Sequence, residues 1–229
     1  MEKVTALSLG GSIIAPDKVD YDFLSKFVKA MKEHLVNRPN EKVIIVTGGG
    51  SVARTYQNAY RSIDPNADND LLDYLGIAAT HINGTLVKAL FREYCFDDLV
   101  IDPTAPIEFK GQILVGAGWK PGFSSDTDAV LLAKRFGAKQ VINLSNIAKV
   151  YTADPKIDPD AKPIDAISWA DFRKMVGSEW VPGKNLPFDP IASREAEQGN
   201  LQVICADGRN IANTFAILRG EKFEGTLIG

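Results

Sequence analysis

Continuously apolar runs alternate along the chain with segments whose apolar residues recur at helical spacing. The runs at residues 3–9, 43–46, 112–115, 140–144 and 201–205 are typical of strands that are buried on both faces. Shorter apolar runs predict strands at 99–101 and 225–228. The helical pattern predicts helices over residues 20–36, 51–62, 70–94, 129–136, 168–177, 191–198 and 211–218. This alternation predicts an α/β fold, a three-layer αβα sandwich around a mainly parallel open sheet.

Three of the predicted strands end in glycine turns, at residues 10–12 (GGS), 48–50 (GGG) and 116–122 (GAGWKPG). Glycines let the backbone approach a ligand, and a helix that begins after them favours a phosphate at its N-terminus. Arg54, in the first turn of the helix after the second strand, adds a guanidinium for the same anion. A single turn of this kind is equally compatible with simple packing. Because the carboxyl ends of parallel strands meet at one edge of a sheet, the three turns together predict two phosphate-bearing ligands that face each other.

Charge and composition narrow the classes of function. The formal net charge is −3 and the pI is near 5.5, which argues against a non-specific nucleic-acid binder. Cys95 and Cys205 lie in apolar surroundings without a CxxC pattern, so we expect buried free thiols and a cytoplasmic protein. With only His34 and His81 present, a histidine-based metal site is not expected. We also expect no signal peptide and no membrane partner, because no apolar run approaches 18 residues.

Several common enzyme motifs do not occur. There is no GxxxxGK[ST] sequence and no GxGxxG after a strand, which disfavours P-loop kinases and standard dinucleotide dehydrogenases. The triple-glycine turn lacks GxSxG spacing, and neither histidine lies in a promising loop, which disfavours a serine hydrolase.

Five segments carry a resemblance to a known family. Residues 7–12, 46–54, 72–80, 118–129 and 150–155 resemble, in this order, the three glycine loops, the acceptor helix and the base-holding segment of the amino acid kinase superfamily. Within it, the chain is similar over essentially its whole length to uridylate (UMP) kinases of the prokaryotic, archaeal type. The YTADP sequence that begins at Tyr151 is the most specific piece, whereas the glycine loops are informative in combination.

The resemblance implies an activity and an organisation. It implies transfer of the γ-phosphoryl group of ATP to UMP, with Mg²⁺ as cofactor and no side chain assigned as its ligand. It also implies one amino acid kinase domain over residues 1–229, with an acceptor and phosphate lobe at about 1–140 and an ATP-binding lobe at 141–229. Uridylate kinases of this type are hexamers, so we expect a homo-oligomer.

The resemblance also implies roles for individual residues. Gly10 and Gly11 are expected to donate N–H groups to the transferring phosphates, and Asp126 to orient the metal–phosphate assembly. The residues expected to bind UMP are Gly49, Gly50 and Arg54 at its phosphate, Asp73 at its ribose, and Ser125 at its border. The residues expected on the ATP side are Ser12, Asn146, Tyr151 against the base, and Asp154.

Two departures from the family pattern leave open which side chain supplies the positive charge of the site. Many members have a lysine just before the first glycine loop, where this chain has Ser8 and Leu9. Another cation must then meet the developing charge, and Lys184 and Lys120 are the candidates, although each is equally compatible with a solvated loop lysine. The family often has Asp-Gly two residues before the conserved tyrosine, where this chain has Ala-Lys, so Lys149 is a candidate for the ATP phosphates.

Two alternatives to UMP kinase activity remain. Relatives that act on isopentenyl phosphate, acetylglutamate, aspartate or carbamate share the scaffold, although a carboxylate acceptor would not obviously need Asp73. The second alternative is a non-catalytic relative that stores molybdenum or tungsten oxyanions. The scarcity of histidine argues against this storage role.

Overall fold

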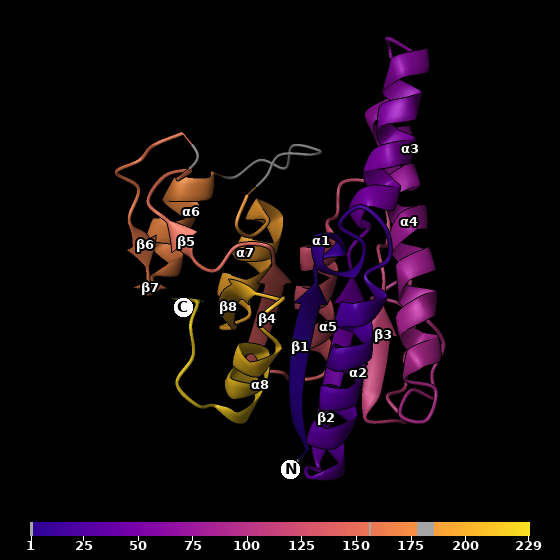
Figure 1. Ribbon diagram of the computed structural model, residues 1–229, viewed down its shortest axis with the longest axis vertical. Coiled ribbons are helices and arrows are strands. Elements are labelled where there is room, and N and C mark those ends of the chain that lie inside the picture. Colours follow the sequence, from indigo (N-terminus) through magenta and orange to yellow (C-terminus); the bar gives the residue numbers. More distant parts are fainter. Residues whose placement is uncertain (1, 156, 178–185) are drawn as a thin grey trace.

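A seven-stranded sheet forms the middle layer of the fold (Figure 1), seen in a computed structural model that describes residues 2–155, 157–177 and 186–229. The strands run in the order β3 (Ile113–Gly116), β2 (Glu41–Thr47), β1 (Lys3–Leu9), β4 (Gln140–Ser145), β8 (Gln202–Asp207), β9 (Thr226–Ile228) and β7 (Ala166–Ile167). All neighbours from β3 to β8 are parallel, and β9 is antiparallel to β8. The predicted mainly parallel open sheet is therefore confirmed.

Helices cover both faces of the sheet. On one face lie α1 (Gly11–Ile14), α2 (Tyr21–Val36), α4 (Asn69–Leu90) and α8 (Ile211–Arg219); on the other lie α5 (Ser125–Arg135), α6 (Trp169–Val176) and α7 (Pro190–Gln198). The helix α3 (Gly50–Ile63) packs on α4, and both rise above the carboxyl end of the sheet (Figure 1). This arrangement is the three-layer αβα sandwich expected from the sequence.

The two cores follow from the alternation of side chains along each strand. In β1, Leu7 packs into the core that contains Phe27 of α2, while the neighbouring Ala6 packs into the opposite core with Ala129 of α5. Each central strand buries residues on both faces, and this explains why the strands read as continuous apolar runs rather than as alternating patterns. The core on the α2 face draws residues from both sides of position 140, such as Leu7 and Phe215.

Side-chain caps account for where most helices begin. Asp20, Asp68, Ser124, Ser168 and Asp189 precede α2, α4, α5, α6 and α7, and each accepts a hydrogen bond from a backbone N–H of the first turn. Such caps satisfy donors that the helix itself leaves unpaired. The cap at Ser124 also explains why α5 starts four residues before the predicted residue 129.

Some of the predicted elements differ from the structure. The strand predicted at 99–101 is reduced to a bridge between Val100 and Gly116. The helix predicted to reach residue 94 ends at Leu90, because the backbone of Phe91, with φ −106° and ψ 21°, leaves the helical conformation. The short helix α1 and the strand β7 had no prediction.

The segment predicted as a loop or short hairpin at 145–152 contains β5 (Val150–Tyr151). This strand pairs antiparallel with β6 (Pro163–Ile164) in a separate two-stranded sheet, which lies beside α6 at the left of Figure 1. The pairing brings Tyr151 opposite Pro163.

Candidate active site

The carboxyl ends of the parallel strands, at the top of Figure 1, carry the three glycine turns. The neighbours of β1 are β2 on one side and β4 on the other, so the strand order reverses at the carboxyl end of β1. Open α/β sheets bind their ligands at such a switch point. The first turn, which directly follows β1, therefore lies at the centre of the candidate site.

The first and second turns pack so closely that neither has room for side chains. A Cβ atom added to Gly11 would lie 1.9 Å from the backbone nitrogen of Gly50, and one added to Gly48 would lie 2.4 Å from the nitrogen of Gly11. Gly50 also has a φ of 67°, a conformation that L-residues rarely adopt. The glycines in these two turns are thus required by the contact between the turns, and this contact brings the predicted donor and acceptor phosphate sites side by side.

Helix α4 fixes the second turn. The side chain of Asn83, which is buried, donates hydrogen bonds to the carbonyls of Gly48 at 2.7 Å and Gly49 at 3.2 Å. With these carbonyls held by α4, the start of α3 is anchored next to the first turn. Arg54 is exposed one turn into α3, and its Nη2 donates to the carbonyl of Pro16 at 2.8 Å.

Helix α4 also fixes the third turn. The N–H of Gly118 donates to Thr80 Oγ1 at 2.8 Å, and its carbonyl lies 2.7 Å from Nε2 of His81. Further along the turn, the N–H of Gly122 donates to Asp73 Oδ2 at 2.9 Å. Asp73, predicted to bind the ribose of UMP, therefore lies directly against the third turn.

Asp126 lies at the start of α5 and reaches the switch point. Its Oδ1 accepts a hydrogen bond of 2.7 Å from the hydroxyl of Ser8, the residue that precedes Leu9 at the end of β1. Burial raises the pKa of Asp126 to about 6, and the nearby charge of Asp189 acts in the same direction, while the Ser8 hydroxyl opposes the rise. No ion pair between Asp126 and a cation occurs among the residues that the structure describes.

Two more carboxyl groups near Asp126 were not predicted. Asp128 is 1% exposed, accepts the N–H of Trp119 at 3.2 Å, and has its pKa raised to about 8 by burial. Asp189, which caps α7, accepts the hydroxyl of Thr127 at 3.1 Å. The sequence did hold a signal for Asp189, since an aspartate before a proline is a common helix start. Asp128 directly precedes the apolar stretch at 129–133 and follows polar residues, so its local sequence did not mark it as buried.

The residues predicted on the ATP side are more widely spread. Tyr151 lies in β5 on the small sheet, with the exposed Asp154 shortly after it, and Asn146 is exposed after β4. The ammonium of Lys149 forms an ion pair with Asp165, next to β6. These positions do not bring Lys149 to the first glycine turn.

Two further predicted residues, Ser12 and Ser125, lie near the starts of α1 and α5. Ser12 belongs to α1, and its carbonyl accepts a hydrogen bond of 3.2 Å from Arg209, an arginine that the sequence analysis did not single out. Ser125 is the first residue of α5 and neighbours Asp126. Lys184, the candidate catalytic cation, lies outside the described residues.

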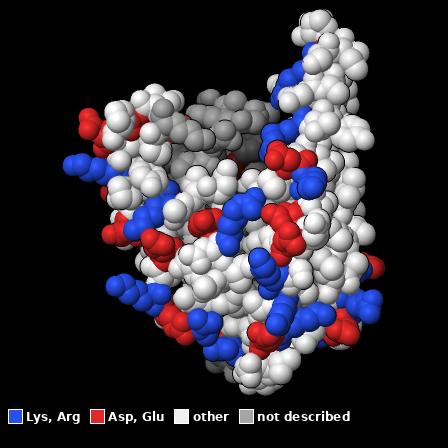
Figure 2. Space-filling model, in the orientation of Figure 1, with Lys and Arg blue, Asp and Glu red and all other residues white. Residues whose placement is uncertain are grey.

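The surface above the sheet is hollowed between the α3–α4 projection and the opposite side of the molecule (Figure 2). Basic side chains follow the edge of the projection that faces this hollow (Figure 2). Helix α3, which belongs to this projection, carries Arg54 near its start and Arg61 in its last turn. The hollow lies above the carboxyl ends of the strands, as the switch-point geometry requires. Among the described residues, none of the helices has the length and hydrophobicity that a membrane span requires.

The sequence of the chain matches the family described as "Amino acid kinase family" over residues 3–207. The match covers the sheet from β1 to β8 and all three glycine turns. The chain therefore belongs to the amino acid kinase family.

Within this family, the similar curated proteins are uridylate kinases. The uridylate kinase of Methanospirillum hungatei is 33% identical over 225 residues, which cover 97% of this chain and 93% of that protein. The uridylate kinase of Pyrococcus abyssi is 31% identical and covers 96% of each chain. The crystal structure of the uridylate kinase from Archaeoglobus fulgidus superposes with a TM-score of 0.81 at 28% identity, covering 98% of this chain and 99% of that one. The UMP kinase of Ureaplasma parvum, at 16% identity and a TM-score of 0.77, shares the fold.

Proposed function

We propose that this chain is an ATP-dependent UMP kinase that transfers the γ-phosphoryl group of ATP to UMP. The observation that carries the proposal is the contact between the first and second glycine turns at the switch point, with Asp126 held beside them by Ser8. Two phosphate sites in direct contact suit the transfer of a phosphoryl group from one nucleotide to another. The uridylate kinases to which the chain is similar over nearly its full length support UMP as the acceptor.

The acceptor side is proposed to bind UMP along α3, α4 and the third turn. Gly49, Gly50 and Arg54 bind the phosphate, because backbone N–H groups and a guanidinium are the donors that phosphate prefers. Asp73 accepts hydrogen bonds from the ribose with the oxygen that Gly122 leaves open, and Ser125 borders the nucleotide.

The donor side is proposed to bind ATP across the switch point. Gly11 donates its N–H to the transferring phosphates, and Ser12 adds a donor from α1. The N–H of Gly10, which was expected to join them, is already donated to the carbonyl of Leu144 at 2.9 Å. Tyr151 packs against the adenine base, and Asn146 and Asp154 complete the nucleotide site. The ion pair of Lys149 with Asp165 must open for this lysine to reach a phosphate. Lys184 stays a candidate for the catalytic cation.

The site fits the Mg²⁺ that accompanies ATP. Asp126 offers a partly exposed carboxylate without a partner cation among the described residues, and Mg²⁺ is usually held by one or two carboxylates together with substrate phosphates. The described residues contain no cluster of three acidic or other ligating side chains, so they do not form a complete Mg²⁺ cage by themselves. When bound, the ion supplies neutralisation of the phosphate charges.

Phosphoryl transfer from ATP to UMP then depends on the positions of the two substrates more than on proton transfer. The phosphate of UMP is already an anionic nucleophile near neutral pH, so a general base is not required. The contact between the two turns puts the proposed donor and acceptor phosphate sites next to each other, as in-line transfer requires, and N–H donors stabilise the charge on the transferred group. Ser8 keeps the carboxylate of Asp126 turned toward this point.

The chain is further proposed to form a cytoplasmic homo-oligomer. Apolar side chains are exposed on the α3–α4 projection, with Tyr56 at 61% and Ile63 at 82%, and Leu71 and Tyr74 line a shallow pocket together with Tyr60. A separate groove of about 550 Å³ between α2 and α4 is lined mainly by apolar residues such as Val28 and Leu86. Surfaces of this kind favour association between copies. Light scattering at several concentrations tests this, and a monomer at micromolar concentration would contradict it.

ADP release from Mg-ATP tests the activity. The acceptor panel is UMP, CMP, dUMP, acetylglutamate, aspartate, carbamate and isopentenyl phosphate. We expect turnover with UMP, and loss of turnover in Asp126→Asn with ATP and UMP binding retained by calorimetry. Turnover with a carboxylate or isopentenyl phosphate but not with UMP would reject the proposal. Nucleotide binding without any turnover in the unchanged protein would favour a non-catalytic relative.

A further inference from the structure

The turn between β8 and α8 carries an arginine that reaches the helix of the first glycine turn. The guanidinium of Arg209 donates a hydrogen bond of 3.2 Å to the carbonyl of Ser12 and another of 3.1 Å to Oδ2 of Asp20. Ser12 belongs to α1, and Asp20 caps α2 with its other carboxylate oxygen. One side chain therefore ties α1 and the start of α2 to the carboxyl end of β8.

The backbone that carries Arg209 is packed against α1. The N–H of Gly208 donates to the carbonyl of Ser145 at 2.9 Å, and a Cβ atom added to Gly208 would lie 3.0 Å from Cγ1 of Ile13. The N–H of Arg209 is bonded in turn to Oδ1 of Asp207 at 2.9 Å. The base of the arginine side chain is thus fixed next to α1, and less conformational entropy is lost when its guanidinium forms the two bonds.

Helix α1 depends on contacts of this kind. It consists of the four residues Gly11–Ile14, and its N-cap, Gly10, has no side chain that could cap it. A single helical turn is unstable alone, because its few hydrogen bonds do not offset the entropy lost in ordering it. The helix α3, which follows β2, holds the end of α1 through the N–H of Ser51, bonded to the carbonyl of Ala15 at 2.8 Å. Arg209 holds α1 from the other side of β1, where β4 and β8 lie.

This contact bears on the donor phosphates, and this step rests on the proposed function. The N–H groups of Gly11 and Ser12 belong to the first turn of α1, so neither has an acceptor within the helix. In the proposed site they bind the transferring phosphates. Carbonyls and N–H groups of a helical turn point in opposite directions along its axis. A donor bound to the carbonyl of Ser12 therefore holds these N–H groups toward the other side, where the phosphates bind.

The candidate cations from the sequence do not make this contact. The ammonium of Lys120 lies over the rings of Trp119 and Phe123, at 3.8 Å and 5.0 Å from their centroids. Lys149 is held in its ion pair beside β6. Among the described cationic side chains, Arg209 is the one that is hydrogen-bonded to α1.

We propose that Arg209 is a positioning residue for phosphoryl transfer, which holds α1 so that the N–H groups of Gly11 and Ser12 face the donor phosphates. Its charge is paired with Asp20 and its side chain is 42% exposed, so its field contributes little. The effect comes from the two hydrogen bonds, through the orientation of the α1 backbone. Charge on the transferred group develops in the transition state, so misaligned donors slow the transfer more than they weaken ATP binding.

Steady-state kinetics of Arg209→Met with Mg-ATP and UMP tests the proposal. We expect a roughly 10-fold fall in kcat, a rise of less than about threefold in the KM for ATP, and a KM for UMP within about twofold of the unchanged value. Arg209→Lys keeps a cationic donor that can serve one of the two acceptors, and its kcat should be intermediate. Asp20→Asn keeps the cap of α2 and the bond to Ser12, so it should lower kcat less than Arg209→Met does.

Arg219→Met is the matched control, because Arg219 forms a comparable ion pair with Glu221 after the last turn of α8 and does not contact α1. Its kinetic constants should equal those of the unchanged protein. A kcat for Arg209→Met equal to that of Arg219→Met would overturn the inference and leave the UMP kinase proposal standing.

The remaining outcomes separate positioning from other roles of Arg209. A rise in the KM for ATP at unchanged kcat would overturn the inference in favour of a direct contact with ATP. Equal losses of kcat/KM for both substrates, with a lower urea midpoint of unfolding, would overturn it in favour of general destabilisation. Absence of UMP turnover in the unchanged protein would instead overturn the proposed function and the inference with it.

Discussion

The hydroxyl of Ser8 and the carboxylate of Asp126, 118 residues apart in the sequence, are joined by a hydrogen bond of 2.7 Å. The bond links the end of the central strand β1 to the start of α5, across the point where the strand order reverses. Many family members are expected to have a lysine close to this end of β1. In this chain a neutral hydroxyl lies there and stabilises the charged form of a half-buried carboxyl group.

Removing this hydroxyl is expected to move the pH profile of the reaction. The pKa of Asp126 is about 6, and the reaction is proposed to need the carboxylate, so kcat should fall as the pH drops through about 6. Ser8→Ala removes a hydrogen bond to the charged form, and the midpoint should therefore rise by about 1 pH unit. Ser62→Ala, which loses only a local bond on α3, is the matched control. An acid limb at the same pH in Ser8→Ala would contradict this assignment.

Arg54 and Arg61 belong to the same helix and provide a matched pair of variants. Arg54 is one turn from the second glycine turn, whereas Arg61 lies in the last turn of α3. A guanidinium that binds phosphate through paired hydrogen bonds contributes about 2–3 kcal/mol, so Arg54→Met should raise the KM for UMP roughly 30- to 150-fold. Arg61→Met should change it less than about threefold, since exposed charges contribute little. Equal effects of the two substitutions on KM would reject a phosphate contact of Arg54.

The contact between the first two turns predicts a steep effect on stability. A methyl group on Gly11 would lie 1.9 Å from the nitrogen of Gly50, and backbone cannot yield as a flexible side chain does. Gly11→Ala should lower the free energy of unfolding by at least about 3 kcal/mol. In Gly76→Ala the new methyl meets the side-chain amide of Gln57, which can move, and the helix α4 should gain up to about 1 kcal/mol. Urea unfolding of both variants measures these changes in the free energy of unfolding. If the two turns could separate easily, Gly11→Ala would not be less stable than Gly76→Ala.

Asp128 should make the protein less stable as the pH rises. Its pKa is about 8 in the folded protein, against an ordinary value near 3.8, because burial penalises the charged form. The folded state therefore keeps a proton that the unfolded state has lost, and stability falls as the pH rises from about 4 through about 8. Asp128→Asn removes this loss, so its stability relative to the unchanged protein should grow by on the order of 1 kcal/mol per pH unit in that window.

Thermal unfolding between pH 5 and 8 measures this difference. Asp98→Asn, at a fully exposed site, is the control and should show no comparable trend. A constant difference between Asp128→Asn and the unchanged protein across this range would show that Asp128 is ionised when folded.

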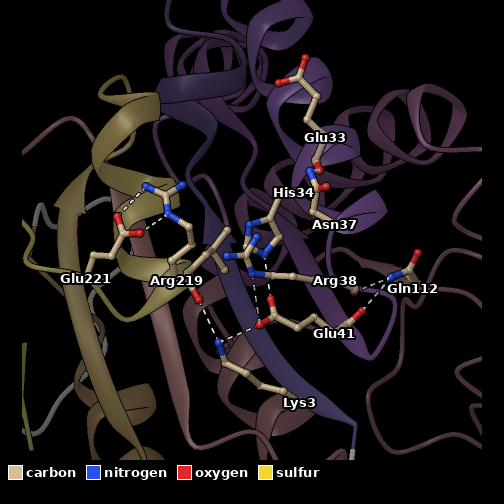
Figure 3. A network of polar contacts seen from close by, with 10 residues as sticks. Lys3, Glu33, His34, Asn37, Arg38, Glu41, Gln112, Arg219 and Glu221 are labelled. Atoms are coloured by element: carbon tan, nitrogen blue, oxygen red, sulfur yellow. Dashed lines mark hydrogen bonds and ion pairs between the residues drawn. The ribbon is translucent and has the colours of Figure 1, made fainter.

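The opposite end of the sheet carries a second buried titratable group. His34, in the last turn of α2, bonds Glu41 Oε2 at 2.8 Å, and Lys3 approaches the other carboxylate oxygen at 3.2 Å (Figure 3). The side chain of Gln112 donates to the carbonyl of Glu41 in the same network (Figure 3). Burial lowers the pKa of His34, while the bond to Glu41 opposes the shift. Nδ1 of His34 is buried without a hydrogen-bond partner among the described residues.

This network predicts a sensitivity to acid. Below its ordinary pKa of 6.5, the histidine of the unfolded chain takes up a proton more readily than the folded one, so stability falls as the pH drops. His34→Gln keeps a donor for Glu41 but cannot titrate. Between pH 7 and pH 5.5 the stability of His34→Gln should fall less than that of the unchanged protein, with a difference of up to about 1 kcal/mol. Denaturant titrations at the two pH values measure this difference. A variant with the same pH dependence as the unchanged protein would rule out His34 as the source.

The sequence by itself determined the layers of the fold and most of the elements. Buried strands such as residues 43–46 and amphipathic helices such as 20–36 are local patterns, and the period of a pattern depends on nothing distant. The glycine turns were recognisable for the same reason, since each follows a strand directly. Their order, with the segment around Tyr151, also indicated the amino acid kinase family, which the comparison over residues 3–207 bears out.

Only the tertiary structure decided which side chains meet. The bond between Ser8 and Asp126 and the rings around Lys120 depend on contacts between elements or on the path of one loop. The same holds for the burial of Asp128, one of whose oxygens has no hydrogen-bond partner among the described residues. Residues 99–101 have an apolar run typical of a strand, but they form a single bridge, from Val100 to Gly116, at the edge of the sheet. Local sequence sets a residue's preference for helix or strand, whereas hydrogen-bond partners and charges are set by neighbours that are distant in the chain.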